Sequence, residues 1–105
     1  MKIDIYGITY EIKEKSTEEL AQIQNDGDDK LYLGLHVALT STIYLNKTIA
    51  LDTKRRTLIH EIGHAILFVQ GYNETYDQEK MVDIIAAHHD YIESILRKWD
   101  KKNKV

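Results

Sequence analysis

Residues 57–67 read TLIHEIGHAIL and contain the pattern H-E-x-x-H at His60, Glu61 and His64. Residues four apart lie on the same face of a helix, so His60 and His64 can direct a ring nitrogen at one ion. Glu61 would lie next to that ion without binding it, where its carboxylate can take a proton from a water at the metal. The pattern predicts a metal site with His60 and His64 as ligands and Glu61 as general base and acid.

The residues around this pattern predict a helix that is buried in the protein core. They are almost all apolar: Leu58, Ile59, Ile62, Ala65, Ile66, Leu67 and Val69. Two histidines and a glutamate in a buried helix are costly to desolvate without partners, and a bound cation removes that cost for the histidines. The alternative interpretation is a pair of hydrogen-bonded histidines without a metal.

Composition narrows the class of protein. The 105 residues are 43% hydrophobic and 30% charged, which predicts one globular domain over residues 1–105. The chain has no cysteine, so a metal needs His, Asp or Glu ligands. The first residues, Met1 to Tyr6, do not form a secretory signal and there is no run of 18 apolar residues, so we expect a cytoplasmic protein without a membrane partner.

The net charge of −3 makes nucleic acid an unlikely partner. Basic residues gather only near the end, at Arg97, Lys98, Lys101, Lys102 and Lys104. Positive charge suits the C-terminus of a helix, so this cluster is interpreted as compensation of the helix dipole. A DNA-associated regulator is a weaker alternative that rests on this cluster alone. The sequence does not indicate an oligomeric state.

Periodicity predicts strands in the first half of the chain. Apolar residues alternate over residues 3–12, with either a hairpin or a bulge at Tyr6-Gly7. A short helix is expected within residues 14–24, capped by Ser16 and Glu19, and a turn at residues 25–29. Residues 31–51 predict one or two strands, the clearest at residues 42–45.

Two helices are expected in the second half, which makes an α+β fold. The first is capped by Asp52 or Thr53, runs to about Gln70 and ends at Gly71. A polar loop at residues 73–77 follows. The second helix spans about residues 78–99, with one buried stripe formed by Val82, Ile85, Ala86, His89, Ile92, Leu96 and Trp99.

A third metal ligand is expected from this last helix. Glu79 is the preferred candidate, because it shares a helical side with Val82, Asp83 and Ala86, which we expect to pack against the first helix. The alternative role for Glu79 is interaction with the helix dipole. Asp83 is the rival, either as ligand or as a group that holds the second ring nitrogen of a ligating histidine.

Other polar residues are assigned weaker roles. Tyr72 and Tyr76 follow the metal helix and could hydrogen-bond an oxyanion, although core or rim packing is the more ordinary role for a tyrosine. His36, His88 and His89 are interpreted as structural or surface histidines.

Residues 57–67, followed by EKMVDIIA at residues 79–86, resemble the ImmA/IrrE metallopeptidase family and the small gluzincin-type domains of phages and mobile elements. That family continues H-E-x-x-H with E-x-x-A-x-x-F-A, and Val82 and Ile85 here replace the first alanine and the phenylalanine. The strand expected at residues 42–45 is similar to the strand that precedes the metal helix in those domains.

The resemblance implies a zincin-like fold, in which a short, mostly antiparallel sheet packs on two or three helices around a central H-E-x-x-H helix. It implies one Zn²⁺ held by His60, His64 and Glu79, with Glu61 as general base and acid in hydrolysis of a protein or peptide substrate. It also implies that the strand at residues 42–45 forms the edge of the substrate cleft. The alternative, suggested by the small size, is a non-catalytic zinc-binding regulatory or interaction domain of phage or mobile-element origin.

Overall fold

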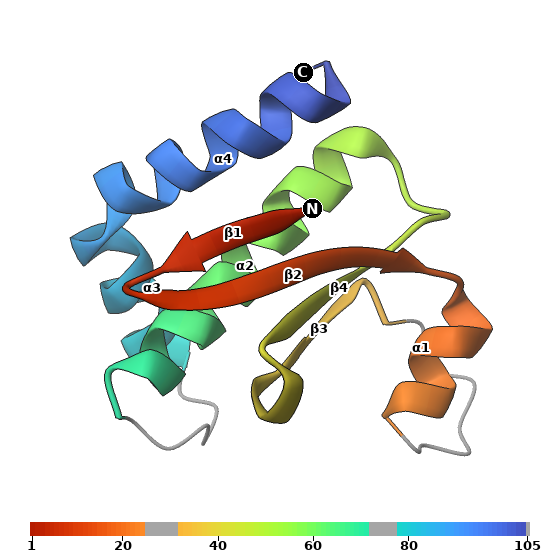
Figure 1. Cartoon of the computed structure of the whole chain (residues 1–105), viewed down its shortest axis with the longest axis horizontal. Coiled ribbons are helices and arrows are strands. Elements are labelled where there is room, and N and C mark those ends of the chain that lie inside the picture. The colour runs from red at the N-terminus through yellow and green to blue at the C-terminus, as the bar shows by residue number, and fades with distance from the viewer. Residues whose placement is uncertain (25–31, 72–77, 105) are drawn as a thin grey trace.

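The computed structural model describes residues 1–24, 32–71 and 78–104, with the backbone alone at residues 78 and 79. Along the chain the elements are β1 (Lys2–Ile5), β2 (Ile8–Lys15), α1 (Thr17–Ile23), β3 (Gly34–Val37), the 3-10 turn η1 (Ala38–Thr40), β4 (Thr42–Asn46), α2 (Leu51–Val69), α3 (Gln78–Ala87) and α4 (His89–Asn103) (Figure 1). The α+β fold class predicted from the sequence is confirmed.

One sheet with the strand order β1-β2-β4-β3 forms the first layer. β1 pairs with β2 and β3 with β4 in antiparallel fashion, whereas β2 and β4 are parallel. The sheet is therefore mostly antiparallel, as expected. β4 is an interior strand and the edge strand beside it is β3, so the expectation that residues 42–45 form the edge is wrong. After β2 the chain passes through α1, forms β3 at the edge and then returns as β4 between β2 and β3, an order that local periodicity cannot show.

Local sequence signals account for the first elements. The Tyr6-Gly7 pair makes a hairpin, with φ angles of 46° and 89° at its two central residues. The Ser16 hydroxyl accepts a hydrogen bond from the Glu19 N–H, and the Glu19 carboxylate accepts one from the Ser16 N–H. This capping box starts α1, as predicted. The predicted turn at residues 25–29 and loop at residues 73–77 lie outside the described residues.

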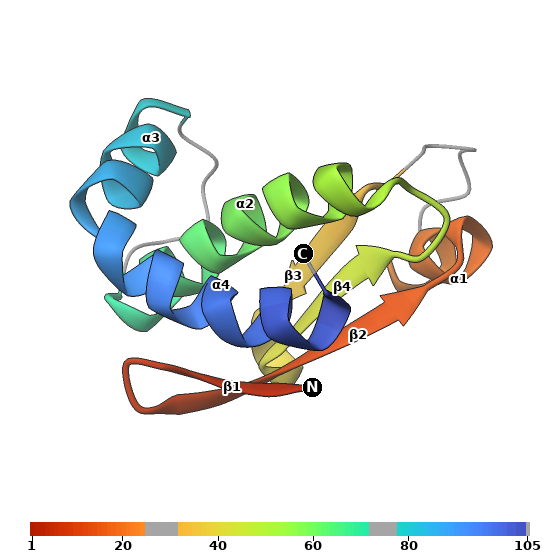
Figure 2. The same cartoon turned by 90° about the horizontal axis from the view of Figure 1, so that it is seen from above.

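α2 lies across one face of the sheet, with α4 beside it (Figure 2). The sequence predicted the C-terminus of α2 correctly and its N-terminal cap wrongly. The helix begins at Leu51 after Ala50, which makes no side-chain cap, so a cap at Asp52 or Thr53 is wrong. Asp52 lies in the first turn instead, where its negative charge interacts favourably with the positive end of the helix dipole. The C-terminus is as predicted, with Gly71 at a φ of 84°.

The single helix expected at residues 78–99 is wrong, because the chain breaks at His88 and forms α3 and α4. α4 buries Ile92, Leu96 and Trp99 of the predicted stripe. α3 instead buries Met81 and Ile84, while Val82 is 65% exposed and Ala86 and His89 are exposed. The break changes the helical phase, so one continuous stripe cannot serve both helices.

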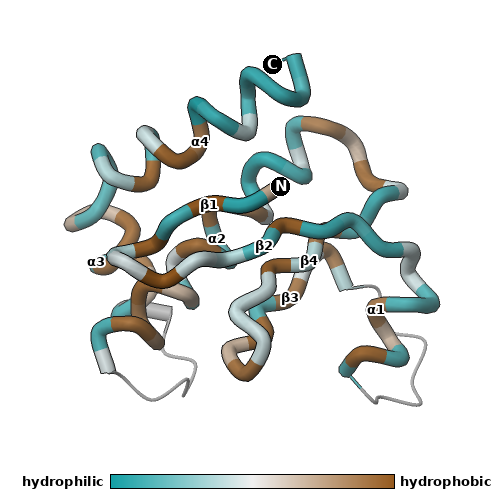
Figure 3. The backbone as a smooth tube through the Cα atoms, viewed as in Figure 1, coloured by the Kyte–Doolittle hydropathy of each residue, from teal (hydrophilic) through white to brown (hydrophobic). Residues whose placement is uncertain are grey.

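The core lies between the sheet and α2, α3 and α4. Figure 3 shows hydrophobic stretches in the strands and along α2, and a hydrophilic C-terminal half of α4. The buried apolar residues form one cluster that comprises Ile3, Ile5, Tyr10, Ile12, Ile43, Leu45, Leu58, Ile62, Ala65, Ile66, Leu67, Met81, Ile84, Ile92, Ile95, Leu96 and Trp99. No helix in the described parts of the chain has the length and apolar content needed to cross a bilayer.

Gly34 lets α2 come close to the edge strand. A Cβ atom at this position would lie 2.6 Å from Thr57 Cγ2 and 2.8 Å from the backbone oxygen of Tyr44. Gly63 is also crowded, but there the nearest atom is the flexible Met81 Sδ at 2.6 Å, and Ala gains helix propensity over Gly.

We expect Gly34→Ala to lower the free energy of unfolding by about 1–3 kcal/mol through this overlap. Gly63→Ala should cost less, because the Met81 side chain can move. Urea denaturation of both variants measures the difference. A Gly34→Ala protein as stable as the wild type would show that β3 and α2 are not in such close contact.

Candidate metal site

The two histidines of the H-E-x-x-H pattern meet on one face of α2. The Nε2 atoms of His60 and His64 are 3.1 Å apart, and the two rings are edge to face with centroids 4.7 Å apart. Two nitrogens that bind one tetrahedral zinc at about 2.0–2.1 Å are about 3.3 Å apart. The spacing of the histidines therefore fits a shared ion.

Glu61 completes a cluster with both histidines. One ligand atom from each of His60, Glu61 and His64 lies within 4.8 Å of the others, and within the described residues this is the group that could hold a metal. Glu61 is 7% exposed. A Cβ atom at Gly34 would be 3.4 Å from Glu61 Cγ, an ordinary contact distance, so the Glu61 side chain lies close to the start of the edge strand.

Burial lowers the pKa of both histidines. For His60 the cause is desolvation. For His64 desolvation is again the largest cause, followed by the charges of His60 and His36, and together they lower the pKa from 6.5 to about 4. Both rings are thus neutral at pH 7, which is the form that binds metal ions.

This shift predicts how the stability of the metal-free protein depends on pH. A histidine whose pKa is lower in the folded state binds fewer protons there than in the unfolded chain between pH 6.5 and 4. We expect the free energy of unfolding in the presence of a chelator to fall by about 1–2 kcal/mol as the pH drops through this window.

Urea denaturation at several pH values measures this dependence, and His64→Gln should flatten it. If the slope between pH 6.5 and 4 is the same in His64→Gln and the wild type, then His64 is not the desolvated group.

His36 is a neighbour of the site that the sequence did not single out. It lies on edge strand β3, and its Nε2 is 2.9 Å from the hydroxyl of the fully buried Tyr10. Its ring centroid is 6.1 Å from that of Phe68, one helical turn after His64. Since Gly34 faces Thr57 and Glu61, and His36 faces Phe68, β3 runs beside the whole length of the site. The position of β3 beside α2 depends on tertiary contacts, and no local motif around His36 indicates it.

The other predicted residues of the site stand as follows. The backbone of Glu79 is in the first turn of α3, and Asp83 is exposed on the same helix. The premise that the side of Val82, Asp83 and Ala86 packs against α2 is wrong, since all three are exposed. The argument from helical side therefore no longer supports Glu79, and its ligand role stays a prediction that rests on the family resemblance. Tyr72 and Tyr76 lie outside the described residues.

The remaining histidines, His88 and His89, are at the helix break. His88 Nδ1 is 2.6 Å from the hydroxyl of Tyr6, which stacks on Tyr91. His89 is exposed. These contacts attach the β1–β2 hairpin to the start of α4, and they agree with the structural role expected for His88.

A groove of about 530 Å³ extends from His60 and Glu61 toward the N-terminus of α2. One wall is a face of α2 and the other is the start of β3. The residues that line it are Leu33, Gly34, Thr53, Arg56, Thr57, His60 and Glu61. The candidate site is thus open to a ligand that lies along α2 and β3.

Comparison with protein families gives a match over most of the chain. The sequence model of the peptidase M78 family, described as the IrrE N-terminal-like domain, matches residues 15–92. The matched range contains His60, Glu61, His64 and Glu79, together with β3, β4 and α2. No curated protein and no solved structure matches the chain.

Proposed function

The chain belongs to the IrrE N-terminal-like domain family of metallopeptidase-like proteins, and from this premise we propose that it is a zinc-dependent metallopeptidase that hydrolyses a protein or peptide substrate. The observation that carries the proposal is the geometry of the H-E-x-x-H residues. The ring nitrogens of His60 and His64 converge at 3.1 Å, and the carboxylate of Glu61 is buried beside them. A merely structural histidine pair does not require a buried carboxylate within reach of both rings.

We assign one divalent ion to His60, His64 and Glu79, which makes the site gluzincin-like. Two imidazoles and one carboxylate are a ligand set that suits zinc and leaves one coordination position open. When bound, the ion would polarise the scissile carbonyl and make water more acidic. The neutral state of both histidines at pH 7, caused by their burial, supports this assignment.

Glu61 would move the proton in this reaction. Its carboxylate accepts a proton from the attacking water as the water oxygen bonds to the carbonyl carbon. It then delivers the proton to the amide nitrogen as the carbon–nitrogen bond breaks, which releases an amine and a carboxylic acid. The Glu61 side chain is buried where α2 faces Gly34, which holds the carboxylate beside the histidines for both transfers.

Edge strand β3 would orient the substrate. Within the described residues β3 pairs only with β4, so the backbone groups on its other side can accept an extended peptide as an additional strand. Such a peptide would pass along α2 and therefore beside Glu61. This role belongs to β3, whereas β4 holds β3 in the sheet.

The proposal is tested with tag-free protein and an unbiased mixture of proteome-derived peptides, analysed by mass spectrometry for new termini. We expect new termini with zinc-loaded protein and none after chelation, with activity restored by added zinc. No cleavage by the zinc-loaded protein, or equal cleavage with and without metal, would contradict the assignment.

A further inference from the structure

α2 carries three consecutive basic residues, Lys54, Arg55 and Arg56, which differ in the strength of their ion pairs. Lys54 Nζ is 2.7 Å from Glu14 Oε1, and the Arg55 guanidinium donates two hydrogen bonds to Asp100, at 2.9 and 3.1 Å. These two pairs tie α2 to β2 and to α4.

Arg56 has a weaker partner. Its guanidinium is 3.9 Å from Asp52, and the two side chains are 76% and 80% exposed. An ion pair this exposed contributes about 0–1 kcal/mol, so Arg56 can exchange Asp52 for another carboxylate at little cost.

Arg56 also lines the groove that leads to His60 and Glu61. Residues 56 and 60 are one turn apart on the same face of α2, so the guanidinium and the candidate ligand border one surface. Asp52 is not among the groove-lining residues. Of the residues that line the groove, Arg56 is the one with a permanently positive side chain, and Thr53 and Thr57 are uncharged.

We propose that this groove is a substrate subsite in which Arg56 binds a carboxylate of the peptide. An arginine binds a carboxylate through two parallel hydrogen bonds, which fixes both position and charge. From Arg56 to Glu61 the helix rises about 7.5 Å. An extended peptide covers that length in about two residues at 3.3 Å each, so the carboxylate lies about two residues from the scissile bond. The inference rests on the proposed peptidase function and adds the chemical class of substrate.

The first experiment is the cleavage profile of the zinc-loaded protein on the proteome-derived peptide mixture. We expect Asp and Glu to be enriched about two positions from the cleaved bond. Arg56→Gln should lose this enrichment, and Arg56→Glu should replace it with a preference for Lys and Arg. Lys101→Gln is the matched control, since it removes the same charge from an exposed position on α4 and should keep the wild-type profile.

The second experiment measures binding without turnover, by fluorescence anisotropy with Glu61→Gln protein. Three labelled probes are compared. The first is a C-terminally amidated peptide with one Glu, the second is the same amidated peptide with Gln in place of that Glu, and the third is the Gln peptide with a free C-terminus. We expect either the Glu peptide or the peptide with the free C-terminus to bind about tenfold more tightly than the amidated Gln peptide. An advantage of the Glu peptide indicates a side-chain carboxylate, and an advantage of the free acid indicates a C-terminal one. Adding Arg56→Gln should abolish either advantage.

Failures of the two proposals can be told apart. If the zinc-loaded wild type cleaves no peptide and the Glu61→Gln protein binds none, the peptidase function is wrong and the subsite falls with it. If peptides are cleaved without a preference for acidic residues, or if Arg56→Gln keeps the preference, the peptidase function stands and the subsite is wrong. Loss of the preference in Lys101→Gln would also overturn it, because the effect would then follow net charge.

Discussion

Glu61→Gln is expected to reduce peptide hydrolysis by about 10²–10⁴-fold, the usual contribution of a positioned general base. The amide has nearly the same shape as the carboxylate but cannot accept a proton from water. Because Glu61 is assigned no bond to the metal, zinc affinity should stay within about threefold of the wild type, well short of the loss that follows removal of a ligand. Initial rates on a peptide that the wild type cleaves, together with zinc titrations of the same samples, measure both quantities.

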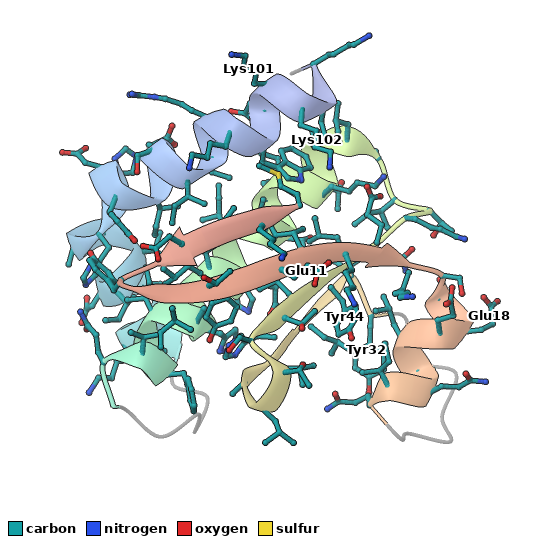
Figure 4. All side chains as sticks on the ribbon, viewed as in Figure 1. Glu11, Glu18, Tyr32, Tyr44, Lys101 and Lys102 are labelled. Atoms are coloured by element: carbon teal, nitrogen blue, oxygen red, sulfur yellow. The ribbon has the colours of Figure 1, made fainter. Side chains whose placement is uncertain are left out.

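Glu18→Gln is the matched control for this variant. Glu18 is exposed on α1, away from α2 (Figure 4), and its replacement removes the same charge without touching the site. The Glu18→Gln protein should hydrolyse at the wild-type rate. A Glu61→Gln protein that retains most of its activity while binding zinc normally would refute the general-base role of Glu61.

His60→Ala and His64→Ala are each expected to weaken zinc binding by about 10³-fold or more, since each removes a ligand rather than a group that supports one. Wild-type protein should also melt at a higher temperature with zinc, because an ion that binds only the folded state stabilises it in proportion to the logarithm of its concentration. Both variants should lose this increase. Metal analysis of tag-free protein and thermal melts with and without zinc measure the two effects.

His89→Ala is the control for the histidine variants, because His89 is exposed on α4. Its metal content and its melting behaviour should match the wild type. If His89→Ala loses zinc, or if His64→Ala keeps it, the ion is not held by the pair on α2.

Local chemistry explains which parts of the fold the sequence could predict. The capping box of Ser16 and Glu19 and the end of α2 at Gly71 each depend on residues within a few positions of one another, whereas at Tyr6-Gly7 the local sequence left a hairpin and a bulge as alternatives. The position of β3 at the edge depends on strand order, which joins segments far apart in the chain. The break at His88 depends on packing, because Met81 faces α2 while the hydroxyl of Tyr6, from the β1–β2 hairpin, contacts His88.

The candidate site likewise has features that the sequence could predict and features that it could not. The spacing of His60 and His64 within one helix was sufficient to predict that their rings meet. The closeness of Glu61 to Gly34 and the position of Arg56 in the groove come from the approach of β3 to α2, and sequence spacing contains neither. The basic residues at the end of the chain are exposed, with Lys101 and Lys102 at the C-terminal end of α4 (Figure 4), where they suit the helix dipole.

The proposed site requires that a carboxylate from α3 joins the two imidazoles on a single cation. Zinc affinity measured by competition with a chromogenic chelator, in Glu79→Ala and Asp83→Ala side by side, tests this most directly. We predict that Glu79→Ala weakens binding by about 10²-fold or more, whereas Asp83→Ala stays within about threefold of the wild type. Wild-type affinity in Glu79→Ala would contradict the proposed ligand set, and a large loss confined to Asp83→Ala would transfer the third ligand to that residue.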